Sequence, residues 1–210
     1  MNIHDTIEQG TDEWHALRCG RITATSFTTM ANGREGTFER LCLSTAAERL
    51  SGQSAADAKG GFTVNDAMQW GLDTEAEGRR AYELETLTHV QQVGFVSLDE
   101  GIGCSPDGLI GEDGGVEIKC PQPHTHESYR LIHAETGDAW KAYKWQIQGT
   151  LWVTGRAWWD FASYCPMTPS KHTLLIERVF PDEDDLKKLK DGSEKARKRI
   201  VELIDHLEGK

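Results

Sequence analysis

The apolar residues of this chain change their spacing near residue 89, and that change limits the folds open to it. Before it, apolar positions recur at helical intervals, as in NDAMQWGLDTEAEGRRAYELETL over residues 65–87. After it, short apolar runs bounded by glycine and proline are typical of strands. Helices followed by strands that alternate with further helices predict an α/β protein with a central mixed β-sheet flanked by helices.

The same periods predict where each element lies. We expect helices over residues 11–18, 22–33, 37–52, 65–87, 126–135, 139–153 and 181–208. We expect strands over residues 89–98, 101–105, 116–120, 156–165 and 172–180, the first three forming a meander. The last helix is amphipathic and begins with the acidic run DEDD. The chain has 210 residues, enough for one sizeable core, so a single domain over 1–210 is predicted.

Composition narrows the possible classes of protein. The five cysteines show no C-x-x-C spacing, which argues against a disulfide framework and a zinc ribbon and favours reduced intracellular thiols. The N-terminus has no basic and apolar leader, and no apolar run approaches the roughly 20 residues that span a bilayer. We therefore expect a soluble cytoplasmic protein without a membrane segment. The net charge of −11 counts against a general nucleic-acid binder, but it is compatible with an enzyme whose carboxylates hold Mg²⁺ where phosphate approaches.

Residues 105–121, SPDGLIGEDGGVEIKCP, contain the pattern with the most chemical content. The two-residue period of a strand sends Glu117 and Lys119 to one face, and Asp107 beside the proline–glycine turn can reach that face. Two carboxylates and the main-chain carbonyl of Ile118 suit a hard cation that keeps several waters. Lys119 would lie where it can orient an attacking water and offset charge on a phosphate. The spacing alone also fits a solvated hairpin with an ordinary Glu–Lys surface pair.

A third carboxylate, Glu75, falls within an apolar helical stripe that includes Met68, Leu72 and Tyr82. A carboxylate that faces a core is costly unless it is paired or bound to metal. This position favours a role for Glu75 in the same metal site. The alternative is a Glu at the edge of the stripe that bonds to Arg79.

A second group of residues suits an anion. Arg18 follows a helical tryptophan, and the hydroxyls of Thr23, Thr25 and Ser26 stand where a helix is expected to begin. Hydroxyls at a helix N-terminus with a nearby Arg make a good phosphate site. Gln146 lies beside the apolar stripe of a later helix. Each of these residues also has a structural interpretation, such as helix capping.

Five segments of the chain, taken in order, carry a family resemblance: EQGTDEWHALRCGRITATSF, AMQWGLDTEAEGRRAYE, CSPDGL, VEIKCP and AYKWQIQGTLWV. They resemble the successive motifs of the phage lambda exonuclease family, also called YqaJ-like viral recombinases, within the PD-(D/E)xK nuclease superfamily. The resemblance extends from about Glu8 to Arg178, which is most of the chain. It implies a restriction-endonuclease-like core, in which a mixed sheet is flanked by helices.

Matched position by position, the resemblance implies that Asp107 and Glu117 bind Mg²⁺, for which Mn²⁺ can substitute. It implies that Glu75 helps to hold the metal ion. It further implies that Lys119 activates water.

The resemblance also implies that Arg18, Ser105 and Gln146 hold the 5′-phosphate of the digested strand. Thr25 stands where the family has Ser. A hydroxyl is kept, but the adjacent Ser26 leaves open which of the two side chains donates to the phosphate.

Two further positions match those that enter the minor groove and wedge the duplex end apart, namely Arg34 and Met68, the latter in place of a family Leu. The implied activity is 5′ to 3′ degradation of linear double-stranded DNA, which releases 5′-mononucleotides and leaves a 3′ overhang. Family members, of phage or prophage origin, form ring-shaped homotrimers around DNA and cooperate with a single-strand annealing protein in recombination.

Three other interpretations stay open. His124 and His126 form H-x-H, which on a strand would suit a transition metal and in a polar loop would be plain surface. A structure- or site-specific endonuclease of the same superfamily would share Asp107, Glu117 and Lys119 but not the end-binding pocket. A non-catalytic adaptor for DNA ends would bind DNA and release no nucleotides.

Overall fold

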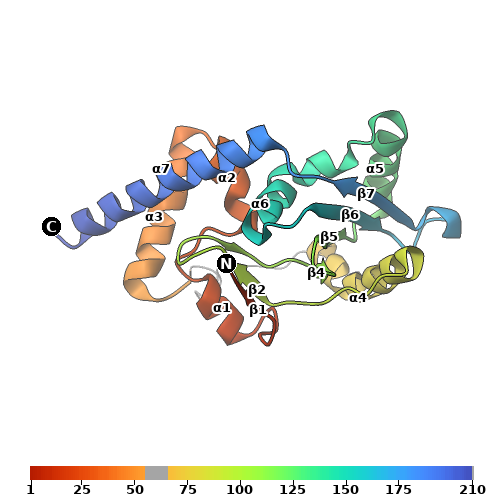
Figure 1. The fold of residues 1–210 in the computed structure, drawn as a ribbon, viewed down its shortest axis with the longest axis horizontal. Helices are drawn as coiled ribbons and strands as arrows, with labels where there is room; N and C mark the ends of the chain where they lie inside the picture. Colours follow the sequence, from red (N-terminus) through yellow and green to blue (C-terminus); the bar gives the residue numbers. More distant parts are fainter. Residues whose placement is uncertain (55–65, 210) are drawn as a thin grey trace.

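The computed structural model describes residues 1–54 and 66–209, and Figure 1 shows the path of the chain. Its strands are β1 (Asn2–His4), β2 (Phe95–Ser97), β3 (Gly103–Cys104), β4 (Gly108–Ile110), β5 (Gly114–Lys119), β6 (Trp158–Tyr164) and β7 (Leu174–Val179). Its α-helices are α1 (Asp12–Arg18), α2 (Phe27–Asn32), α3 (Glu35–Ser51), α4 (Asp66–Thr86), α5 (Pro123–Thr136), α6 (Lys144–Thr154) and α7 (Glu183–Leu207). Short 3₁₀ helices are η1 (Ala24–Ser26), η2 (Ala139–Tyr143) and η3 (Ser170–His172).

The larger sheet has the strand order β4-β5-β6-β7. Strands β5 and β6 run parallel, whereas β4 pairs with β5 and β7 with β6 in antiparallel fashion. Two parallel neighbours need a crossover, and here α5, η2 and α6 provide it. Figure 1 shows α4 below this sheet and α5 and α6 above it. The predicted fold class, a mixed sheet flanked by helices, is therefore confirmed.

The predicted meander of three strands is wrong. Strands β2 and β3 do pair with each other, but they form a separate sheet of order β1-β2-β3, in which β2 also pairs with β1, a strand that the sequence did not indicate. The strand that pairs with β5 is β4, which lies between the predicted strands 101–105 and 116–120, where no strand was expected. Only residues 111–113 connect β4 to β5, and Gly111 takes a φ of 53°, a left-handed value that glycine adopts without strain.

The two faces of the larger sheet bury different apolar clusters. On one face, Val116, Ile118 and Cys120 pack with Tyr82 of α4. The other face contributes side chains such as Trp159 and Phe161 to the main core, which also contains residues of α6. Strand alternation explains the division, because successive side chains point to opposite faces.

Helix α4 lies close to β5 at Gly78. A Cβ atom at this position would lie 3.1 Å from the Cys120 sulfur and 3.2 Å from atoms of Ile118 and Tyr164. A glycine in mid-helix costs about 1 kcal/mol relative to Ala. At Gly78 the close approach of helix α4 to the strand explains why a glycine is present despite this cost.

A buried polar cluster joins α4 to the two strands beyond β5. The Tyr82 hydroxyl donates to Asp160 Oδ2 at 2.6 Å, and Arg178 donates to the same carboxylate through Nε at 2.8 Å and Nη2 at 2.9 Å. Arg178 also lies over the ring of Trp158, 3.7 Å from its centroid. Because Asp160 is 1% exposed and has three donors, it ties β6 and β7 to the helix.

Helix α7 packs against α2 and α3, to which it lies adjacent in Figure 1. Its N-cap, Asp182, accepts a hydrogen bond from Asp185 N at 2.9 Å, and its buried face includes Leu189 and Ile200. A Cβ atom at Gly192 would lie 2.3 Å from the Met30 carbonyl oxygen, so glycine permits the crossing of α7 and α2. None of the described helices is long and apolar enough to cross a membrane.

Candidate active site

Strand β5 carries Glu117 and Lys119 on the face away from α4, as its two-residue period predicts. Glu117 is 1% exposed, which excludes a solvated hairpin. Its Oε1 accepts hydrogen bonds from Lys119 Nζ and from Gln146 Nε2 at the start of α6. The strand therefore places a carboxylate and an ammonium group in a buried environment, with an amide that arrives from the crossover.

Asp107 lies beside this pair at the start of β4. Its Oδ2 accepts a hydrogen bond from Ile118 N at 2.7 Å, which brings it to the middle of β5. Burial and the negative charge of Asp107 raise the pKa of Glu117 to about 7, and burial raises the pKa of Asp107 as well. Burial lowers the pKa of Lys119, but the charges of Glu117 and Asp107 outweigh it, and the net pKa lies above the usual value. Two carboxylates crowded in a buried site thus share one close cation.

Glu75 of α4 lies in a helical stripe that is only partly buried. Leu72 is 61% exposed, so the predicted stripe is not buried at this position. The face of α4 that packs on the sheet instead includes Gly78 and Tyr82. Helix α4 thus buries its predicted stripe at Tyr82 and exposes it at Leu72, and Glu75, which lies between them, is partly buried.

The alternative partner for Glu75, Arg79, is the one observed. Arg79 Nη2 donates to Glu75 Oε1 at 2.6 Å, and the Glu75 side chain is 33% exposed. Both residues line a pocket of about 550 Å³ together with Asp107. Burial and the charge of Asp107 raise the pKa of Glu75. The Glu75 carboxylate is therefore close enough to Asp107 for their charges to interact. Across residues 1–54 and 66–209, however, no three His, Cys, Asp or Glu side chains are already arranged around a metal position.

The predicted anion site is partly assembled around Ser105. Arg18 Nη1 donates to Ser105 Oγ at 3.1 Å, and Trp14 Nε1 donates to the same oxygen at 2.9 Å. The Arg18 guanidinium lies over the Trp14 ring, 4.2 Å from the centroid. Arg18 Nη2 also donates to Thr23 Oγ1 at 3.3 Å. Arg18 and Ser105 are thus brought together, two residues before Asp107.

Thr25 and Gln146 line a second pocket, of about 340 Å³. Its other lining residues are Ala24, Thr28 and residues 141–145. Thr25 is exposed, whereas Ser26 is half-buried. Since Gln146 also donates to Glu117, it connects this pocket to the carboxylates.

Residues 13–157 match the family described as the YqaJ-like viral recombinase domain. The chain belongs to this family. No curated protein matches the chain.

Solved structures show how far the family fold extends. An alkaline exonuclease, LHK-Exo from Laribacter hongkongensis, is 29% identical to the chain, with a TM-score of 0.80 over 94% of this chain and 96% of that one. The same protein in complex with dAMP gives a TM-score of 0.81 at the same identity and coverage. A phage-related exonuclease from Haemophilus somnus 129PT, 14% identical, matches 89% of this chain and 96% of its own with a TM-score of 0.70, which shows the shared fold.

Of the two residues that the family resemblance assigns to the DNA duplex, the structure describes the side chain of one. Arg34 is exposed at the N-terminal end of α3. Met68 falls within α4, and its side chain is not among those the structure describes.

The H-x-H pair does not form a metal site. His126 is buried, its Nδ1 lies 2.8 Å from Ser163 Oγ and its Nε2 lies 2.7 Å from the His172 carbonyl oxygen. Both ring nitrogens are therefore occupied by protein groups, in a helix rather than in the polar loop or strand considered from the sequence.

Sequence reasoning missed three residues that hold this site. Gln9 Nε2 donates to the carbonyls of Val93 and Pro106, both at 3.0 Å, and so supports the chain just before Asp107. Trp14 supports Ser105, and Tyr143 contacts Lys119. Each lies within a family motif, but only the folded chain shows what it contacts.

Proposed function

We propose that this protein is a Mg²⁺-dependent exonuclease that degrades one strand of linear double-stranded DNA from its 5′ end, releasing 5′-mononucleotides and leaving a 3′ overhang. Family membership and the fold shared with LHK-Exo support a metal-dependent nuclease that acts on DNA. The observation that carries the finer proposal is the placement of Ser105 with Arg18 two residues before Asp107, which joins an anion site to a buried carboxylate pair.

The donor groups fit a hard divalent cation. Asp107 and Glu117 supply carboxylate oxygens, the ligands that Mg²⁺ and Mn²⁺ prefer, and their crowding raises the pKa of Glu117 until a cation relieves it. Glu75 and the carbonyl of Ile118 are the further ligands that we propose. When bound, the ion would supply Lewis-acid stabilisation of charge on the phosphate.

Lys119 acts in this proposal as an ammonium group. In the metal-free site burial lowers its pKa, but the charges of Glu117 and Asp107 raise it by more, so the side chain is held there as an ammonium group that can donate hydrogen bonds. It would orient the attacking water and offset negative charge that develops on the phosphate oxygens. Its proximity to Glu117 keeps it beside the reacting centre.

Ser105 and Arg18 would hold the 5′-phosphate. The Ser105 oxygen already accepts two N–H donors, so its own hydrogen is left to donate. A hydroxyl in this state, beside a guanidinium, suits an anion. Gln146 and the hydroxyl of Thr25 or Ser26 would complete the pocket. Each cut creates a new 5′-phosphate for the same pocket, which accounts for directional movement along the strand.

The remaining elements of the proposal follow the family. Residues 1–210 would act as one nuclease domain, with the C-terminal helix as part of it. Three copies would form a ring around DNA, Arg34 and Met68 would enter and open the duplex end, and a single-strand annealing protein would take up the overhang.

One experiment tests polarity, end requirement and metal dependence together. Linear duplex DNA with a single 5′-phosphate is digested with Mg²⁺ or with a chelator, and each strand is followed on a denaturing gel. We expect the phosphorylated strand alone to shorten from its 5′ end, and only with Mg²⁺. Covalently closed circles should stay intact.

A Lys119→Ala variant provides the control, and it should fold and bind DNA but release nucleotides far more slowly. Cleavage of closed circles would favour an endonuclease instead. Binding of linear DNA by the unaltered protein without nucleotide release would favour an adaptor.

A further inference from the structure

We propose that Tyr143 is a positioning residue that holds the ammonium group of Lys119 at the reacting centre through the face of its aromatic ring. This inference rests on the proposed nuclease function. Lys119 Nζ lies over the Tyr143 ring, 5.0 Å from its centroid. A cation within roughly 6 Å of a ring face is attracted by the negative charge of that face.

The ring of Tyr143 is itself held in place from two sides. It stacks on Phe161 with centroids 5.6 Å apart and an angle of 28° between the planes. Its hydroxyl lies 3.1 Å from that of Tyr129, whose ring packs edge-on against Phe161 at 5.7 Å. Phe161 lies directly opposite Glu117 in the β5–β6 register. The aromatic group is therefore fixed to the strand next to the proposed metal ligands.

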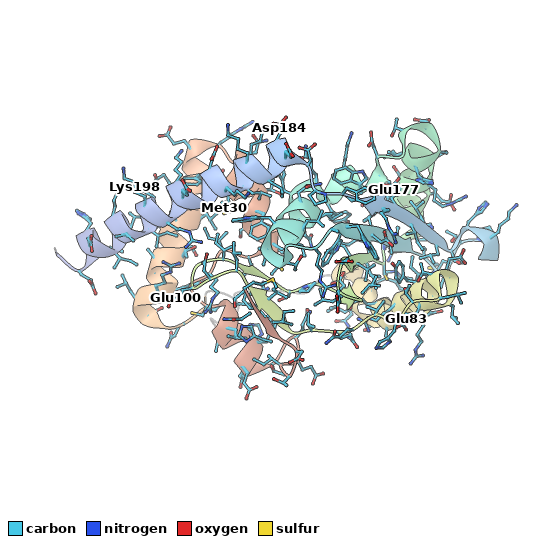
Figure 2. All side chains as sticks on the ribbon, in the orientation of Figure 1. Met30, Glu83, Glu100, Glu177, Asp184 and Lys198 are labelled. Atoms are coloured by element: carbon cyan, nitrogen blue, oxygen red, sulfur yellow. The ribbon has the colours of Figure 1, made fainter. Side chains whose placement is uncertain are left out.

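The main chain that carries Tyr143 is also anchored. Glu177 of β7, labelled in Figure 2, is buried and accepts hydrogen bonds from Ala139 N at 3.2 Å and Trp140 N at 2.8 Å. These N–H groups lie in the first turn of η2, the short helix that ends at Tyr143. His133 Nδ1 adds a third contact to Glu177 at 2.7 Å. The position of the ring is thus set by the sheet.

A fixed ring matters because the Lys119 side chain is long and its other close partner has a second task. In the structure Glu117 pairs with Lys119, but Glu117 is also a proposed metal ligand. The Glu117–Lys119 pair would be weaker with a cation bound at Glu117, since two positive groups would then compete for one carboxylate. The Tyr143 ring carries no charge and takes no part in this competition. It would therefore keep the Lys119 ammonium group in place both with and without a cation at Glu117.

The test compares Tyr143→Leu, which removes the ring, with Tyr143→Phe, which keeps it. We expect kcat at saturating Mg²⁺ and DNA to fall roughly 2- to 30-fold in Tyr143→Leu, the range of cation–π energies, and to change less than about 2-fold in Tyr143→Phe. In a Lys119→Ala background, Tyr143→Leu should add little further loss. A second readout uses the metal-free protein, in which the Lys119 Cε protons should show an upfield ring-current shift by NMR that Tyr143→Leu abolishes.

Several outcomes would overturn this inference. An equal loss of kcat from Tyr143→Leu with and without Lys119 would show that the ring acts on packing alone. Tyr143→Phe as damaging as Tyr143→Leu would assign the effect to the hydroxyl. If Tyr143→Leu does not fold, Phe analogues with increasing ring fluorination replace it, and an unchanged kcat across that series would also reject the inference. Normal turnover in Lys119→Ala would reject the proposed role of Lys119 itself, which separates the two failures.

Discussion

Removing the hydroxyl of Tyr82 is expected to destabilise the fold without changing the chemistry. This hydroxyl donates to Asp160 at 2.6 Å, and both side chains are buried, at 0% and 1% exposure. Tyr82→Phe leaves Asp160 paired with Arg178, so the loss is one hydrogen bond to a charged acceptor, worth about 1.5–3 kcal/mol. In a chain of this length, 1 kcal/mol lowers Tm by about 2–4 °C. The expected decrease in Tm is therefore roughly 3–12 °C.

Tyr164→Phe is a matched control within the same apolar cluster. The Tyr164 hydroxyl donates to Glu77 Oε1 at a similar distance, 2.7 Å, but Glu77 is exposed. Water can replace the lost partner there, so the expected cost is less than about 1 kcal/mol. The free energy of unfolding of each variant is measured by urea denaturation, with m-values expected to match that of the unaltered protein. Equal losses in the two variants, or a loss below about 0.5 kcal/mol in Tyr82→Phe, would refute the reasoning. Turnover at 25 °C should stay within about 2-fold in both, because Tyr82 and Tyr164 lie on the face away from Glu117.

Two further predictions concern the phosphate pocket and pH. Trp14→Phe removes the indole N–H that donates to Ser105 Oγ and to the Gly94 carbonyl. We expect KM for a 5′-phosphorylated duplex to rise roughly 2- to 10-fold relative to KM for a 5′-hydroxyl duplex. An equal change in KM for the two duplexes would contradict this prediction. Burial lowers the pKa of His126, which contacts Ser163, below the value of about 6.5 expected in the unfolded chain. The neutral side chain therefore stabilises the fold fully above the unfolded-state pKa, and this stabilisation is lost as the pH falls through the folded-state pKa. In His126→Asn, the slope of unfolding free energy against pH between about 7 and 5 should be smaller by up to roughly 1.4 kcal/mol per unit; identical slopes in urea titrations would exclude a shifted His126.

The side of β5 on which Glu117 and Lys119 lie could be read from the sequence, because the strand period allows only two faces and the apolar residues occupy one. Helical periodicity was less informative for the surroundings of Glu75. A helical stripe identifies the apolar face of α4 but not how much of that face the sheet covers, and Leu72 is left in solvent. The pairing of Glu75 with Arg79, four residues further along the same helix, could be anticipated from the sequence, whereas its place in a pocket with Asp107 depends on tertiary packing.

Very short strands, and contacts between residues far apart in the chain, could not be predicted from the sequence. Strands β1 and β4 have only three residues each, too few for any period to appear. The contact of Tyr143 with Lys119 depends on the crossover between two parallel strands, and that of Glu177 with η2 on the strand beyond them. A sequence can identify such residues as parts of a motif, but the return path of the chain decides which groups they meet.

The partners of this site differ greatly in how far apart they lie along the chain. Asp107 and Ile118 are 11 residues apart and Gln146 and Glu117 are 29 apart, whereas 87 residues separate Arg18 from Ser105. Longer loops cost more entropy to close. The contacts made by the proposed metal ligands Asp107 and Glu117 thus join nearby segments, whereas the contact of Arg18 with Ser105 in the proposed end-binding pocket closes a much longer loop. A molecule whose first helix opens locally would keep its carboxylates in place while losing the ability to recognise a DNA end.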